Sequence, residues 1–209
     1  MKQEANWLEM IKALLPLISV LLAPLIGFLV WRWQEKRRRT LEAEDLYEDA
    51  CSYLNRALSM FDEAEMDVPT KQELLEEAIA RFKKALNRGL PKRKEKLFFE
   101  FQESGSSYEV SIRKDAAAHF KLAEALTEVG RIREANMNYS KAIQIEPRFA
   151  QAFYRRGMNY YIYGELAEAQ GDFQAVLEIY SDHEDAMFWQ KKVKEELQEM
   201  EAIGDERSV

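Results

Sequence analysis

The sequence has little of the side-chain chemistry that most enzymes and metal sites use. Its 209 residues include one cysteine, Cys51, and two histidines, His119 and His183. A single cysteine excludes an intramolecular disulfide and a cysteine-based metal cluster, and neither histidine has a nucleophile or a second ligand at a telling spacing. The sequence also lacks a glycine-rich phosphate loop. We therefore expect no catalytic residue, no metal site and no cofactor.

Helix-breaking residues are scarce as well, with eight glycines and five prolines. Together with 47 % hydrophobic and 32 % charged residues, this composition favours amphipathic helices around a sizeable core. The net charge of -7 is unevenly distributed, because residues 1–39 are net basic and the remainder is net acidic. An acidic body argues against nucleic acid as a partner, since phosphate contacts require a basic surface.

The second half of the chain repeats its pattern of small and aromatic residues every 34 positions. The equivalent pairs are Ala123 with Gly157, Leu126 with Tyr160, Gly130 with Gly164, Ala135 with Ala169 and Tyr139 with Phe173. This period is typical of a helix–turn–helix repeat, and the segment 116–181 resembles the tetratricopeptide repeat (TPR) family. The resemblance implies that small residues let paired helices approach closely and that Gly130 and Gly164 supply left-handed backbone at the turns.

These repeats lead to an expected division of the whole chain. It comprises a short extension (1–12), an apolar run (13–31), a basic segment (32–40), a long helix and a second helix that form a degenerate repeat (41–89), an insertion (90–114), two clear repeats (116–149 and 150–183), a capping helix (184–203) and a flexible tail (204–209). Thr70 and Glu73 predict a capping box at the start of the second helix, and Gly89 predicts its end.

The apolar run 13–31 contains no charged side chain. As a helix it would extend about 28 Å, close to the roughly 30 Å of a hydrocarbon core. Because basic residues follow it directly, the positive-inside rule predicts a single-pass membrane protein with its N-terminus outside and its repeats in the cytoplasm, or in the stroma of an organelle. Pro16 and Pro24 indicate a kinked anchor. A cleaved signal peptide and a buried core helix are the alternatives.

The expected fold is therefore all-α, with one transmembrane helix followed by a TPR-type right-handed helical solenoid. The insertion complicates this picture, because Leu97 and Phe99, and then Tyr108, Val110 and Ile112, occupy alternating positions. Alternation of this kind is compatible with a small β-hairpin. An extended loop remains the alternative.

Two basic clusters are candidate contacts for anionic lipid headgroups. The first consists of Arg37, Arg38 and Arg39, and the second of Lys92, Arg93 and Lys94. The alternative for the second cluster is a solvated helix end whose cations complement the helix dipole.

The TPR resemblance implies that the inner faces of the first helices line a partner-binding groove. The positions assigned to it are Phe120, Glu124, Thr127, Glu128, Gln151, Tyr154, Met158, Tyr161, Phe188 and Lys192. The lysines and asparagines by which some TPR co-chaperones clamp a peptide carboxylate are absent, since the matching positions hold Phe120, Glu124 and Met158. Packing against the insertion or the first helix pair is an equal alternative for some of these side chains.

Taken together, the sequence predicts a membrane-anchored adaptor that binds partner proteins and serves in the assembly or quality control of a membrane protein complex. Membrane lipid is expected to meet the N-terminal helix, and no enzyme activity is expected. A permanent structural subunit of a membrane complex and a protein-import receptor are the alternatives. The pattern specifies neither the partner nor the oligomeric state.

Overall fold

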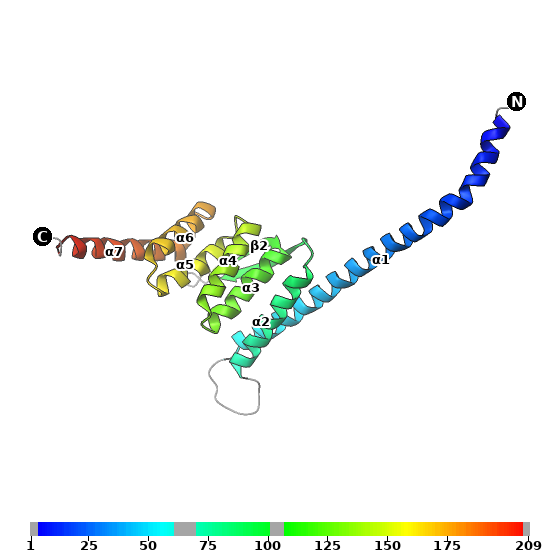
Figure 1. The fold of residues 1–209 in the computed structure, drawn as a ribbon. Helices are drawn as coiled ribbons and strands as arrows, with labels where there is room; N and C mark the ends of the chain where they lie inside the picture. Colours follow the sequence, from blue (N-terminus) through cyan, green and yellow to red (C-terminus); the bar gives the residue numbers. More distant parts are fainter. Residues whose placement is uncertain (1–3, 61–69, 101–106, 207–209) are drawn as a thin grey trace. The chain divides into compact units, whose positions relative to one another are not determined.

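The computed structural model describes residues 4–60, 70–100 and 107–206, and the side chains of residues 22–60, 70–99, 108–200 and 202. The chain divides into two compact units, Met1–Glu42 and Ala43–Val209. The elements shown in Figure 1 are α1 (Glu4–Leu58), α2 (Lys71–Arg88), β1 (Lys94–Glu100), β2 (Ser107–Arg113), α3 (Lys114–Glu128), α4 (Ile132–Ile145), α5 (Ala150–Ile162), α6 (Leu166–Ile179) and α7 (Glu184–Glu206). Helix α1 contributes residues to both units.

The structure of the first unit contradicts the predicted transmembrane helix. Residues 13–21 lie outside the residues whose side chains are described, and the described apolar residues 22–31 are followed at once by Arg32. In the described part of the chain no helix is both long and apolar enough to cross a membrane. The predictions of a transmembrane helix and of a single-pass location are therefore wrong.

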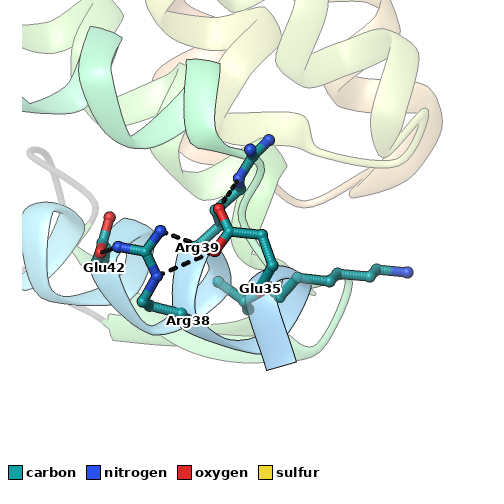
Figure 2. Close-up of polar contacts among 6 residues, drawn as sticks. Glu35, Arg38, Arg39 and Glu42 are labelled. Atoms are coloured by element: carbon teal, nitrogen blue, oxygen red, sulfur yellow. Dashed lines mark hydrogen bonds and ion pairs between the residues drawn. The ribbon is translucent and has the colours of Figure 1, made fainter. Parts of the chain in front are cut away.

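Charged side chains of α1 form hydrogen bonds with one another just after its apolar segment (Figure 2). Glu35 accepts hydrogen bonds from Arg38 at 2.7 Å and from Arg39 at 2.8 Å, and Arg38 also reaches Glu42 at 3.2 Å. These bonds lower the pKa of Glu35, and pairs three and four residues apart support a helix. Arg38 and Arg39 are among the side chains assigned to lipid headgroups from the sequence, and that assignment stays a prediction.

In the second unit, the ends of α2 follow the sequence signals. The Thr70 hydroxyl accepts a hydrogen bond from the Glu73 backbone N–H at 3.2 Å, and the Glu73 carboxylate accepts one from the Thr70 N–H at 2.8 Å. Gly89 ends the helix with a φ of 89°, a conformation that glycine adopts without the steric cost of a Cβ. The predicted capping box and stop are both confirmed.

The two clear repeats form the helix pairs α3–α4 and α5–α6, and α7 packs on α6 (Figure 1). Gly130 and Gly164 have φ values of 76° and 75°, as the repeat pattern predicts for these turns. The small residues at the helix contacts are fully buried; they include Ala123, Ala135, Ala142 and Ala169. At Gly157 a Cβ atom would lie 3.1 Å from both Asp172 and Phe173, so any larger residue there would have to displace these side chains by a few tenths of an ångström.

The insertion between α2 and α3 forms a β-hairpin, which decides between the two alternatives left by the sequence. Strands β1 and β2 pair antiparallel, with Phe99 opposite Tyr108 and Leu97 opposite Val110. The residues expected to form its turn lie outside the described residues. Pairing aligns the alternating apolar side chains on one face, which then packs against the helices.

At the C-terminus, α7 extends to Glu206, beyond the expected boundary at residue 203. The sequence places the flexible tail from Gly204 onward, whereas the described helix includes Gly204. A glycine inside a helix costs only about 1 kcal/mol relative to alanine, so it weakens a helix without necessarily ending it.

Polar contacts link the helix pairs around Arg156 of α5. Its guanidinium donates two hydrogen bonds to the buried Asp172 of α6, at 2.8 and 2.7 Å, and a third to Ser140 of α4 at 2.7 Å. This paired, bidentate geometry raises the pKa of Arg156 and makes the bond specific for arginine. One side chain thus connects the two repeats.

We expect Arg156→Leu to lower the free energy of unfolding by about 3 kcal/mol, because the substitution leaves the Asp172 carboxylate buried without its cation. Urea unfolding followed by circular dichroism would measure the loss. The matched control is Arg133→Leu at an exposed position of α4, for which we expect a change within about 0.5 kcal/mol. Equal losses in the two variants would contradict this role for Arg156.

A buried histidine caps the last helix. The Nδ1 atom of His183 accepts a hydrogen bond from the backbone N–H of Ala186 at 3.3 Å, in the manner of a side-chain N-cap. Burial lowers the pKa of His183, although the carboxylates of Asp185 and Asp182 act in the opposite direction. Because protonation of Nδ1 removes the acceptor, the cap requires the neutral ring.

Stability should therefore fall in mildly acidic solution. Below the ordinary histidine pKa of about 6.5 the unfolded chain binds a proton that the folded chain resists, so the free energy of unfolding decreases as the pH falls. We expect a lower melting temperature at pH 5.5 than at pH 7.5, with a smaller difference in His183→Asn, which keeps a capping side chain without a titratable ring. An unchanged pH dependence in that variant would show that His183 is not responsible.

Candidate functional site

The C-terminal part of α1, helix α3 and helix α5 are the first helices of successive pairs, and the hairpin packs against all three. From β1, Glu95 accepts a short hydrogen bond from Tyr47 of α1, and the Phe99 ring lies 5.5 Å from the Phe120 ring of α3. From β2, the Tyr108 hydroxyl donates to Gln151 of α5 at 2.8 Å. The hairpin therefore covers part of the surface to which the sequence assigns a groove.

Phe120 belongs to the core of the second unit. Its side chain is 1 % exposed, and its ring also lies 5.6 Å from Tyr139 of α4 and 4.8 Å from Phe149. These aromatic contacts across three elements leave no surface of Phe120 for a partner. Phe120 therefore packs against the insertion, which is the alternative to a groove position that the sequence left open.

Gln151 and Tyr154 of α5 are similarly enclosed, with 5 % and 3 % exposure. Gln151 bonds the hairpin, while Tyr154 stacks on His183 with ring centres 5.4 Å apart and approaches Phe173 at 6.0 Å. Three of the assigned groove residues, counting Phe120, thus stabilise the fold rather than face solvent.

A pocket of about 210 Å³ lies where α1 ends beside α3 and α5. Its apolar side includes Leu58, Met158 and Ile162, and its polar side includes Glu124, Glu128 and Arg155. Of the groove residues assigned from the sequence, the structure brings Glu124, Thr127, Glu128, Tyr154 and Met158 together in this pocket.

Five residues that line this pocket lie outside the groove assigned from the sequence: Leu58, Tyr139, Arg155, Asn159 and Ile162. The apolar spacing of the helix predicts that Leu58 packs in the core. In the structure Leu58 is the last residue of α1, and its side chain is 45 % exposed. Ile162 is 67 % exposed at the end of α5. An apolar residue in the last turn of a helix is the signal that could identify both, whereas Arg155 carries no such signal.

The acidic wall of the pocket is incompletely neutralised. Glu124 is 23 % exposed and its carboxylate lies 3.8 Å from the Arg155 guanidinium, beyond hydrogen-bonding distance. Burial raises the pKa of Glu124 and Glu128 acts in the same direction, while Arg155 and Lys121 lower it. Glu128 itself pairs with Lys71 at 3.0 Å.

The remaining polar groups hold the pocket in shape. The Asn159 side chain donates to Asn136 at 2.9 Å and to Thr127 at 3.3 Å, which ties α5 to α3 and α4. By contrast, the Nε atom of Arg155 is buried and has no hydrogen-bond partner among the described residues. A buried donor without an acceptor is costly.

The other three assigned groove residues form a separate cluster on α5 and α7. Tyr161 donates to Glu196 at 2.7 Å, and the Lys192 ammonium lies 5.2 Å from the Tyr161 ring and 4.9 Å from the Trp189 ring. Phe188 is 52 % exposed and meets Trp189 edge to face. The described lining of the pocket does not include this cluster.

The second basic cluster lies at the start of the hairpin. Arg93 pairs with Glu44 of α1 at 2.6 Å, and Lys92 and Lys94 are exposed. From the first cluster, Arg37 lies over the Trp33 ring at 5.4 Å. Lipid contact by these residues stays a prediction. Among the described residues, no group of three or more His, Cys, Asp or Glu side chains could hold a metal ion.

Comparison with known sequences identifies a short region of similarity. No protein-family model matches the chain. A stretch of 67 residues is 40 % identical to human tetratricopeptide repeat protein 13, and this stretch amounts to 32 % of the present chain and 8 % of that protein. The chain therefore spans a small fraction of the length of that relative.

Solved structures show the same fold at low sequence identity. The first TPR domain of Spaghetti (RPAP3) bound to the HSP90 peptide SRMEEVD has a TM-score of 0.53 at 17 % identity, over 76 % of this chain and 95 % of that chain. The TPR domain of Arabidopsis OM64 has a TM-score of 0.51 at 16 % identity, over 76 % and 98 %. The TPR2B domain of yeast Sti1 in complex with pHsp70 gives 0.51 at 16 %, over 75 % and 99 %.

These similarities agree with the 34-residue period, the left-handed turns and the buried small residues. The chain is a mostly helical, TPR-like solenoid, and its match to a human tetratricopeptide repeat protein supports that family for its repeats.

Proposed function

We propose that the chain is a protein-interaction adaptor that holds a peptide segment of a partner in the pocket between α1, α3 and α5. The observation that supports this most is the composition of the pocket, to which three successive first helices contribute side chains. Its volume of about 210 Å³ is below the roughly 300–1,000 Å³ of small-molecule sites. It suits one anchoring side chain of a peptide better than a whole cofactor.

The rim and wall of the pocket fit that role. Leu58 and Ile162 expose apolar surface at its edge, where an aliphatic side chain of a partner would lose contact with water. The Arg155 side chain, which lines the pocket and is 42 % exposed, would donate from its guanidinium to a backbone carbonyl of the bound segment. Two proteins of similar fold are described as complexes with an HSP90 peptide and with pHsp70, which supports peptide binding on this type of scaffold.

A selection from a random-peptide display library with the full chain as bait would test the proposal. We expect enriched peptides to bind Leu58→Glu or Met158→Ala at least about tenfold more weakly than the wild type, because loss of a buried aliphatic contact costs about 1.5–3 kcal/mol. Isothermal titration calorimetry would give the affinities, and circular dichroism would verify folding.

Met200 provides a matched control, since it is 62 % exposed on α7 and does not line the pocket. Met200→Ala should bind the selected peptides as the wild type does. The proposal fails if no peptide is enriched, or if the enriched peptides bind the pocket variants and the control equally.

A further inference from the structure

The hairpin limits how a peptide can lie on the first helices. It contacts α1 through Glu95, α3 through Phe99 and α5 through Tyr108. A segment of another protein cannot occupy those positions while the hairpin is seated. The surface left to a partner is the pocket beside Glu124, where the chemistry of a few side chains decides which peptides fit.

The charged lining of that pocket consists of two carboxylates and one guanidinium, and Lys71 pairs with one of the carboxylates, Glu128, at 3.0 Å. Glu124 and Glu128 belong to the same helix and both line the pocket. The cation on the opposite wall, Arg155, stays 3.8 Å from Glu124. Lys121, the other nearby cation, is directed to Cys51 at 3.4 Å and to Glu95 of the hairpin at 3.9 Å. The Glu124 carboxylate is thus partly buried without a hydrogen-bonded cation.

A peptide cation would complete this arrangement. A charge-assisted hydrogen bond from an ammonium or guanidinium group would stabilise a half-buried carboxylate more than it would an exposed one. An acidic peptide would instead bring like charges together beside Glu124 and Glu128, which opposes binding. Burial disfavours the charged form of Glu124 and raises its pKa, and a positive neighbour would act in the opposite direction.

We infer that the pocket selects a segment in which an aliphatic side chain is adjacent to a lysine or arginine. The aliphatic group contacts Leu58 and Met158, and the cation binds Glu124. This inference rests on the proposed peptide-binding function and specifies its ligand. It separates the chain from the similar structure that is bound to SRMEEVD, a peptide with three acidic residues and one arginine.

Two synthetic peptide pools of equal length would test the inference by fluorescence anisotropy with the full chain. Both carry a central leucine, flanked in one pool by Lys or Arg and in the other by Asp or Glu. At pH 7.5 we expect the basic pool to bind at least about tenfold more tightly. Glu124→Gln should remove most of that preference, while Glu168→Gln, an exposed change on α6, should leave it intact.

The pH dependence gives a second readout. Binding of the basic pool should weaken as the pH falls from 7.5 to 5, because protonation of Glu124 removes the acceptor for the cation, and the dependence should be smaller in Glu124→Gln. The charged groups around Glu124, which are Arg155 on α5 and Lys121 and Glu128 on α3, are present in both proteins. The difference in pH dependence between the wild type and Glu124→Gln therefore reports the contribution of the Glu124 carboxylate.

The inference is overturned if the acidic pool binds as tightly as the basic one, or if the preference for the basic pool persists in Glu124→Gln. If neither pool binds but the display selection yields peptides that depend on Leu58 and Met158, the charge preference is wrong while peptide binding stands. If the selection also yields none, the peptide-binding function itself has failed.

Discussion

The packing of Phe120 is the contact on which the second unit depends. Its ring meets Phe99 of the hairpin at 5.5 Å, Tyr139 of α4 at 5.6 Å and Phe149, just before α5, at 4.8 Å. One side chain thereby joins the insertion, its own helix pair and the next one. Replacement of such a buried aromatic by alanine typically costs about 3–5 kcal/mol, so its place in the structure leaves little freedom for exposure to a ligand.

The hairpin also determines which side chains of the first helices are covered. The hairpin covers Phe120 and Gln151. At the C-terminal ends of α1 and α5, Leu58 and Ile162 remain exposed to solvent. The pocket there combines apolar edges with two glutamates and a buried arginine donor. A TPR-like scaffold can therefore differ in its preferred ligand through one insertion, without any change in how its helices pair.

The features predicted correctly from the sequence depend on neighbours along the chain. The Thr70–Glu73 capping box, the left-handed turns at Gly130 and Gly164, and the close helix contact at Gly157 each follow from local geometry or from one repeat period. The transmembrane prediction is wrong, because no helix in the described part of the chain is both long and apolar enough to cross a membrane.

The sequence by itself determined the helix pairs, because capping, glycine turns and the 34-residue period act over short distances along the chain. Only the tertiary structure decided which side chains of the first helices face solvent. That outcome depends on contacts between residues far apart in sequence, such as Tyr108 with Gln151 and Glu124 with Arg155. A repeat register assigns a side chain to one face of a helix, but whether that face stays open is determined by whatever else folds against it.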